Sequence, residues 1–167
     1  MNENNKARLV IDSPIGPISL LSENDTLVGL YFGKVYDEWG QGTSPLRGVG
    51  QSPTVLTLCE KELAEYFAGE LKDFTVPVRA RGTPFREKVW AELRKIPYGK
   101  TVSYKDVAVG IGNEKAVRAV GGANHHNPVS IIIPCHRVLG ADGSLTGYGG
   151  GMEVKQWLLD LEARYAG

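Results

Sequence analysis

The stretch SYKDVAVGIGNEKAVRAVGGAN, residues 103–124, predicts two short helices separated by glycines. Ser103 with Asp106 three residues later is the pattern of a capping box, so a helix is expected to begin here. Two glycines then interrupt that helix, and Asn113 is a suitable cap for a second helix running toward Gly121. Two short helices joined by a glycine turn predict a helix-turn-helix, a pattern shared with many other helical hairpins.

Basic side chains are concentrated around this stretch. The whole sequence of 167 residues has 19 basic and 19 acidic side chains, so its net charge is zero. Residues 79–118, however, carry 10 Lys and Arg against 4 Asp and Glu, whereas residues 1–78 carry 6 against 11. Such a segment is typical of a polyanion-binding face, and a solvated helix surface is the alternative interpretation.

The flanking segments predict a two-lobed α/β protein. Three short apolar runs near the N-terminus, separated by turn residues, are typical of a β-meander, and a Gly-rich stretch at 34–51 predicts a long loop. A helix is expected over 53–69, and an extended segment over 71–82 leads to the second lobe. Thr83 followed by a proline predicts the start of another helix. An amphipathic helix is expected to close the chain at 152–165.

The run IIIPCHRV, residues 131–138, ends an apolar segment in a cysteine, a histidine and an arginine. A strand is expected over 127–133, followed by the reactive turn, a hairpin and a glycine loop. From these residues alone Cys135 is a nucleophile, a metal ligand or a core thiol. A nucleophilic thiol needs a base nearby, and His136 is adjacent. Neighbours on a strand point to opposite faces, so the pair can cooperate only if the strand ends or bends.

Composition excludes several classes of protein. The two cysteines, Cys59 and Cys135, lack the spacing of a zinc site, and neither a structural metal nor a disulfide is expected. Cys59 falls on the apolar side of the 53–69 helix and is expected to be a core residue. No apolar run is long enough to span a membrane, and the polar N-terminus is unlike a secretory signal, so the chain is expected to be cytoplasmic.

Five motifs, in this order, resemble the C-terminal domain of the O6-alkylguanine-DNA alkyltransferases, also called methylated-DNA–protein-cysteine methyltransferases. They are TPFREKVWAELRKIPYGKTVSYKDVA (83–108), RAVGGAN (118–124), NPVSIIIPCHRV (127–138), GYGGG (147–151) and KQWLLDLE (155–162). In the N-terminal part, IDSPIGPISL (11–20) and YFAGEL (66–71) are similar to the bacterial Ogt-type members.

The resemblance implies an α+β fold with two domains. Residues 1–78 would form a ribonuclease-H-like α/β domain with a small antiparallel sheet. Residues 79–167 would form a mostly helical DNA-binding and alkyltransferase domain, with a winged-helix-like helix-turn-helix and the active-site cysteine.

The implied activity is DNA repair by direct damage reversal. The alkyl group of O6-alkylguanine, and less surely of O4-alkylthymine, would move irreversibly to Cys135 after the nucleotide is flipped out of the duplex. Each molecule would react once and need no cofactor. The implied partner is double-stranded DNA, bound through its minor groove by a monomer, and cooperative binding along DNA stays open.

The resemblance also implies roles for individual residues. Cys135 would accept the alkyl group, His136 would take the thiol proton through a water, and Glu162 would orient that histidine. Tyr104 would donate its hydroxyl to the departing purine, and Arg118 would enter the space left by the flipped nucleotide. The other residues expected to contact substrate or DNA are Ser103, Ala119, Gly121, Gly122, Asn127, Val138, Tyr148 and Gly149.

Three of the latter have a specific implied task. Asn127 would tie the recognition segment to the active-site turn, the Val138 carbonyl would accept from the guanine amino group, and Tyr148 would stack on the base. Without the resemblance, the residues themselves favour a solvated carboxylate at Glu162, and a phosphate contact or a surface charge at Arg118.

The chain departs from some relatives in its pocket wall. Asn124 stands where some carry an apolar residue and Gly149 where some carry serine, which suggests a more open wall that admits bulkier adducts. No role is assigned to His125 and His126.

Two other functions stay open. One is a DNA-binding sensor that flags lesions without efficient transfer, which stoichiometric self-alkylation would exclude. The other is a cysteine hydrolase with a Cys-His-Glu triad, which predicts turnover of an ester or amide.

Overall fold

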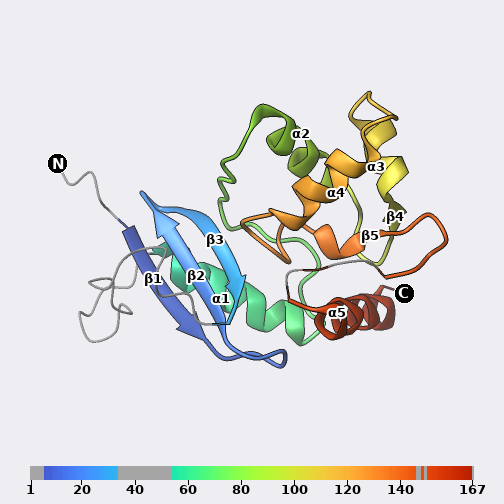
Figure 1. The fold of residues 1–167 in the computed structure, drawn as a ribbon. Helices are drawn as coiled ribbons and strands as arrows, with labels where there is room; N and C mark the ends of the chain where they lie inside the picture. The colour runs from blue at the N-terminus through green and yellow to red at the C-terminus, as the bar shows by residue number, and fades with distance from the viewer. Residues whose placement is uncertain (1–5, 34–53, 146–147, 149, 167) are drawn as a thin grey trace. The chain divides into compact units, whose positions relative to one another are not determined.

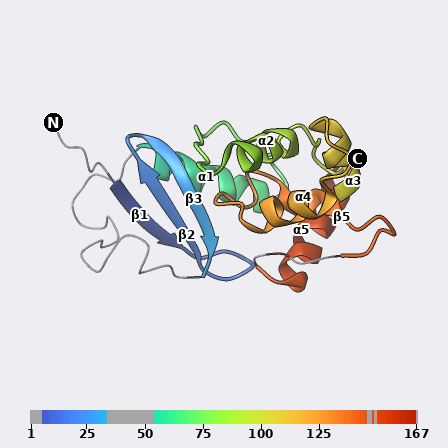
Figure 2. The same ribbon diagram turned by 45° about the horizontal axis from the view of Figure 1, so that its top comes forward.

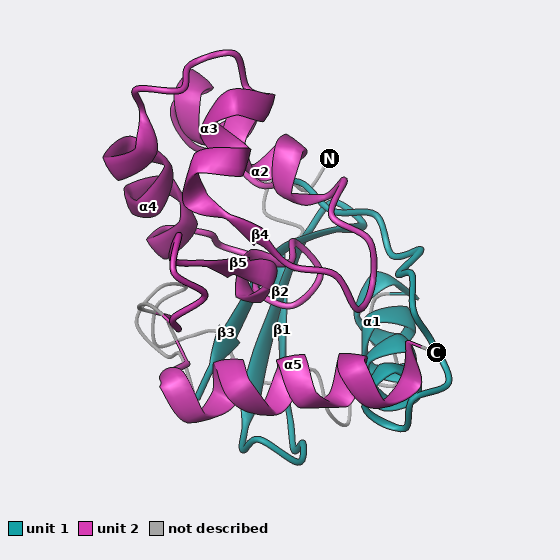
Figure 3. Cartoon of the chain, turned by 90° about the vertical axis from the view of Figure 1, so that its right-hand side faces the viewer, with its two compact units in different colours: residues 1–79 teal, residues 80–167 magenta. Residues whose placement is uncertain are grey.

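The computed structural model describes residues 6–33, 54–145, 148 and 150–166. It divides into two compact units, residues 1–79 and 80–167 (Figure 3). The loop expected at 34–51 and the glycine at 149 lie outside the described residues. No helix in the described ranges is both long and apolar enough to cross a membrane.

The first unit begins with a three-stranded antiparallel meander, as predicted (Figure 1). Its strands are β1 (Lys6–Ile11), β2 (Ile18–Glu23) and β3 (Thr26–Phe32), in spatial order β1-β2-β3. Asn24 and Asp25, which join β2 to β3, both have positive φ, at 51° and 64°. This is the conformation of a two-residue hairpin turn, and Asn and Asp tolerate it well.

Helix α1 (Thr54–Phe67) lies across one face of this sheet (Figures 1 and 2). The core between them is aliphatic, and Cys59 is completely buried in it, which confirms the expected core role. Burial, with the charges of Glu62 and Glu60, raises the pKa of the Cys59 thiol to about 12. Cys59 is therefore a protonated, inert thiol at neutral pH.

The segment after α1 joins the sheet by one bridge. Val78 pairs with Leu27 in parallel, and the Arg79 amide donates to the Leu27 carbonyl at 2.9 Å. The carboxylate of Glu62 accepts from the backbone amides of Thr75 at 2.9 Å and Val76 at 3.1 Å. This buried carboxylate therefore ties the segment to α1.

The second unit is built on three packed helices, α2 (Pro84–Leu93), α3 (Tyr104–Gly110) and α4 (Val117–His125). Two predicted helix starts are confirmed. The Thr83 hydroxyl accepts from the Arg86 amide at 3.2 Å, and Ser103 and Asp106 form the reciprocal capping box. The indole of Trp90 donates to the Ala123 carbonyl at 2.8 Å and so joins α2 to α4.

The predicted start of the second helix was wrong. Asn113 caps no helix: its carbonyl accepts from the Ala116 amide at 3.0 Å, which closes a separate turn. Helix α4 begins only at Val117 and continues past Gly121 to His125.

The remaining elements surround a parallel pair, β4 (Val102–Ser103) with β5 (Val138–Leu139). A 3₁₀ turn, η1 (Cys135–Arg137), precedes β5, and helix α5 (Met152–Tyr165) contacts it. The possible hairpin in this segment stays a prediction, because β5 pairs with β4 and residues 146–147 lie outside the described residues. The chain then closes a turn in which the Gly140 amide donates to the Ser144 carbonyl at 2.9 Å.

The strand expected over 127–133 was also wrong. Ile131 has a φ of 72°, a left-handed conformation that an extended strand excludes and that a β-branched residue adopts only under constraint. The amide of Ile132 donates to the Ser130 carbonyl at 2.8 Å and that of Ile133 to Val129 at 3.0 Å. These local bonds fold the apolar run into successive turns.

Candidate active site

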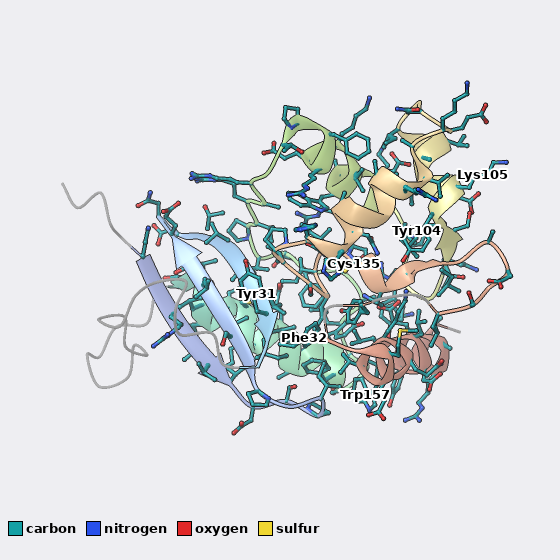
Figure 4. The ribbon with its side chains drawn as sticks, viewed as in Figure 1. Tyr31, Phe32, Tyr104, Lys105, Cys135 and Trp157 are labelled. Atoms are coloured by element: carbon teal, nitrogen blue, oxygen red, sulfur yellow. The ribbon has the colours of Figure 1, made fainter. Side chains whose placement is uncertain are left out.

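Cys135, His136 and Arg137 form a 3₁₀ turn, in which adjacent side chains are free of the alternation that a strand imposes. The Cys135 amide donates to the Ile133 carbonyl at 2.7 Å, and the Arg137 amide donates to Pro134 at 3.0 Å. Neighbours on a 3₁₀ turn are rotated by about 120°, whereas on a strand they point to opposite faces. Cys135 and His136 are both buried, and Figure 4 shows Cys135 close to α4.

Glu162 of α5 is the centre of a buried hydrogen-bond network. One carboxylate oxygen, Oε2, lies 2.7 Å from His136 Nε2 and 2.9 Å from Arg137 Nη2. The other, Oε1, accepts from Arg137 Nε at 2.8 Å and from the Gly99 amide at 3.2 Å. Burial alone would raise the pKa of Glu162, but its bonds to His136 and Arg137 hold the pKa well below its usual range. Glu162 is an anion here, and it is not solvated.

The partner of His136 determines its tautomer. Because an ionised carboxylate only accepts, Nε2 must carry the proton that is donated to Glu162. The other ring nitrogen, Nδ1, is buried and has no hydrogen-bond partner among the described residues. Burial lowers the pKa of His136, although Glu162 opposes this. His136 is therefore a neutral imidazole whose open Nδ1 can accept a proton.

The thiol of Cys135 needs such a base. Burial raises its pKa, and the side chains of Asn127 and Ser130 and the charge of Lys155 only partly oppose this. The thiol is thus protonated at rest, and a thiolate must be formed by transfer of the proton to a neighbouring group.

Two asparagines connect α4 to the cysteine turn. Asn127 donates from Nδ2 to the Ile133 carbonyl at 2.8 Å and accepts from the Val129 amide at 3.0 Å. Asn124 donates to the Cys135 carbonyl at 3.3 Å. Asn127 therefore links the segment after α4 to the turn, whereas the contact of Asn124 is one that sequence reasoning missed.

Lys155 is a second residue that sequence reasoning missed. It is completely buried in α5, and its Nζ donates to the Val138 carbonyl at 2.8 Å. A carbonyl has two lone pairs, so Val138 can accept a further bond from a ligand. Lys155, Leu158 and Glu162 are spaced at i, i+3 and i+7, which places them on one face of α5. This spacing in the sequence could have indicated that Lys155 lies on the same buried face as Glu162.

Five of the residues expected to contact substrate or DNA lie on α3 and α4. Arg118, Ala119 and Gly122 are exposed on α4, and a Cβ placed at Gly122 would meet no atom within 4 Å. Tyr104 is half-buried at the first position of α3, beside the exposed Lys105 (Figure 4).

The structure also gives the positions of other residues singled out in the sequence. Ser103 caps α3, Gly121 is half-buried in α4, and Tyr148 is buried. His125 and His126 are exposed at the end of α4, where His126 Nδ1 lies 2.8 Å from the Gly122 carbonyl. In the described parts of the chain, no three His, Cys, Asp or Glu side chains are grouped as metal ligands would be.

Together, the fold and the site define a protein that carries a buried Cys-His-Glu constellation on a helix-turn-helix unit. The model of the 6-O-methylguanine DNA methyltransferase ribonuclease-like domain matches residues 8–80, and that of the DNA binding domain of the same family matches residues 84–164. The chain belongs to the 6-O-methylguanine DNA methyltransferase family, and the expected resemblance and fold class are confirmed.

Curated relatives carry the corresponding name. The methylated-DNA–protein-cysteine methyltransferase of Methanosarcina acetivorans is 44% identical over 159 residues, covering 92% of this chain and 96% of the relative. That of Mycobacterium tuberculosis is 46% identical over 153 residues, covering 91% and 89%.

Solved structures agree over nearly the whole chain. The crystal structure of the M. tuberculosis O6-methylguanine methyltransferase has a TM-score of 0.86 at 44% identity, covering 97% of this chain and 95% of that one. The structure of the same organism's OGT in complex with DNA has a TM-score of 0.85, with coverage of 95% and 94%.

Proposed function

We propose that this protein repairs O6-alkylguanine in double-stranded DNA by moving the alkyl group irreversibly to Cys135. The observation that carries the proposal is the buried thiol on a turn whose next residue, His136, is oriented by Glu162 and has an open Nδ1. This is the order of nucleophile, base and orienting acid that activates a weak nucleophile.

The chemistry balances without a cofactor. The thiol proton passes through a water to His136 Nδ1, and the thiolate attacks the alkyl carbon. A carbon–sulfur bond forms as the carbon–oxygen bond breaks, and the electron pair of the broken bond goes to guanine. Tyr104 donates a hydrogen bond to the leaving purine. Because the thioether has no route back to a thiol, each molecule reacts once.

Burial of the thiol requires the substrate base to leave the duplex. Cys135 is only 3% exposed, so a stacked base cannot reach it. Arg118 on α4 fills the vacated space, and the small residues Ala119, Gly121 and Gly122 let the helix approach a minor groove closely. Ser103 begins α3 beside the phosphates.

The extruded guanine is bound in a pocket on the cysteine side. The Val138 carbonyl accepts from its amino group, Tyr148 stacks on it, and Asn127 couples the pocket to the segment after α4. The same site would also accept O4-alkylthymine. The domain boundary falls near 78/79, and the protein acts as a monomer in the cytoplasm.

The test is the intact mass of the protein after mixing with a duplex carrying one O6-methylguanine. One methylene should be added per molecule, stopping at one equivalent. Cys135→Ala should gain none, and Cys59→Ala, the matched control at the other cysteine, should gain the same as wild type. Lesion binding without a mass change would overturn the proposal and leave a damage sensor, and multiple turnover would indicate a hydrolase.

A further inference from the structure

We infer that Arg137 is a positioning residue for this transfer: it holds the Glu162 carboxylate so that His136 keeps its proton on Nε2 and offers Nδ1 to the thiol. The catalytic part of this inference rests on the proposed function. The geometry that supports it stands independently.

Arg137 is fixed on every side. Its Nε and Nη2 make two parallel bonds to the two Glu162 oxygens, at 2.8 and 2.9 Å, which is the bidentate geometry preferred between guanidinium and carboxylate. Its Nη1 donates to the Ile96 carbonyl at 2.6 Å. The guanidinium also lies over the Tyr98 ring, 5.7 Å from its centroid. A planar group held at these points cannot rotate without losing several contacts at once.

The same contacts determine where Glu162 points. Both of its oxygens are engaged by Arg137, and the Gly99 amide adds a bond to Oε1. Only Oε2 is directed to His136. A carboxylate held in this way accepts the Nε2 proton in one orientation, which selects the imidazole tautomer that leaves Nδ1 open.

Arg137 also balances the charge of Glu162. Among the described residues, the charged groups that act on His136 are Glu162 and Lys155 from α5 and Arg137 from its own turn. Glu162 raises the pKa of His136, whereas burial and the two cations lower it. Without Arg137, the unbalanced carboxylate would favour imidazolium, in which both ring nitrogens are protonated and neither can act as a base.

The first experiment follows His136 directly. Nitrogen NMR of ¹⁵N-histidine protein reports tautomer and protonation, and the chain has only three histidines. Wild type should show His136 as the Nε2–H tautomer at pH 7, with a pKa below the usual value for histidine. In Arg137→Met the transition should move up by about one pH unit. Arg164→Met, at an exposed arginine in the last turn of α5, is the matched control and should leave it unchanged.

The second experiment is the pH dependence of transfer from duplex O6-methylguanine. A neutral histidine is the active base, so the rate rises as the pH passes upward through the His136 pKa. Raising that pKa in Arg137→Met should move the acid limb to higher pH by the same amount. An equal loss of rate at every pH, with the His136 transition unmoved, would reduce Arg137 to a structural role and overturn the inference.

Arg137→Lys keeps the test decisive if Arg137→Met does not fold. A lysine retains the charge but cannot make two parallel bonds. The acid limb should stay near that of wild type, while the maximal rate falls roughly tenfold. A lysine variant equal to wild type in rate and in the His136 spectrum would overturn the inference. If wild type transfers no alkyl group, the proposed function fails, and the NMR titration still tests Arg137.

Discussion

At the residue scale, the carboxylate of Glu162 is a buried anion that connects several groups of the site. It is 1% exposed and joins His136 and Arg137 of the 3₁₀ turn to the Gly99 amide, so its partners come from two separate parts of the chain. Removing one partner of a buried charge pair leaves the other uncompensated, so such a network responds sharply to substitution.

Glu162→Gln should lower the transfer rate by about a hundredfold or more, because a neutral amide orients His136 poorly and cannot stabilise the imidazolium that forms. Single-turnover kinetics on duplex O6-methylguanine measure this. The control is Glu153→Gln, an exposed position in the first turn of the same helix, which should transfer at the wild-type rate. Equal rates in both variants would remove Glu162 from the mechanism.

At the element scale, the turn at 96–99 connects the site to the start of the helix-turn-helix. Its Ile96 carbonyl accepts from Arg137, its Gly99 amide donates to Glu162, and the chain then enters β4 and α3. Gly99 has a φ of 78°, and a Cβ added there would collide with the Cβ of Ala166. This glycine is therefore required by conformation and by space.

A matched pair of glycines separates these two requirements. Gly112 has a similar φ of 81°, but a Cβ there would meet nothing within 4 Å. Gly112→Ala should cost about 1 kcal/mol in the free energy of unfolding, from the backbone alone. Gly99→Ala should cost about 1–3 kcal/mol more, through the collision, and should also slow transfer. Urea unfolding of both variants measures the difference, and equal losses would show that the collision with Ala166 is relieved at no cost.

At the scale of the whole molecule, a net charge of zero conceals a strongly basic segment. Residues 79–118 carry 10 of the 19 basic side chains, and they include α2, α3 and the start of α4. Binding of DNA by this segment releases counterions in proportion to the phosphates contacted, whatever the charge of the rest of the chain.

Lys105→Glu should therefore weaken DNA binding at all sequences and reduce the slope of log K against log salt by about 1. Lys105 is exposed on α3. Lys61→Glu, on α1 of the other unit, changes the net charge of the chain by the same amount and should leave the slope unchanged. Titrations at several salt concentrations measure both, and a similar effect of the two substitutions would point to net charge instead of a local face.

Local signals allowed much of the fold to be predicted. The β-meander, the Thr83 cap and the Ser103–Asp106 capping box depend on neighbours within a few residues, so the sequence was sufficient for them. The strand expected over 127–133 failed because a run of isoleucines favours extended backbone locally, whereas Asn127 and the left-handed Ile131 bend it. The start of α4 failed for a similar reason, since Asn113 closes a turn instead of a helix.

The sequence by itself determined the family, because contiguous motifs carry it, and those motifs contain the cysteine, its adjacent histidine and the glutamate in the last helix. Only the tertiary structure decided how they act together. It turned Cys135 and His136 onto a 3₁₀ turn, brought Glu162 to His136 across 26 positions of chain, and buried Arg137 and Lys155 as part of the site. The physical reason is that the tautomer, charge and orientation of these groups depend on burial and on partners distant in sequence, which only the packed fold brings within hydrogen-bond distance.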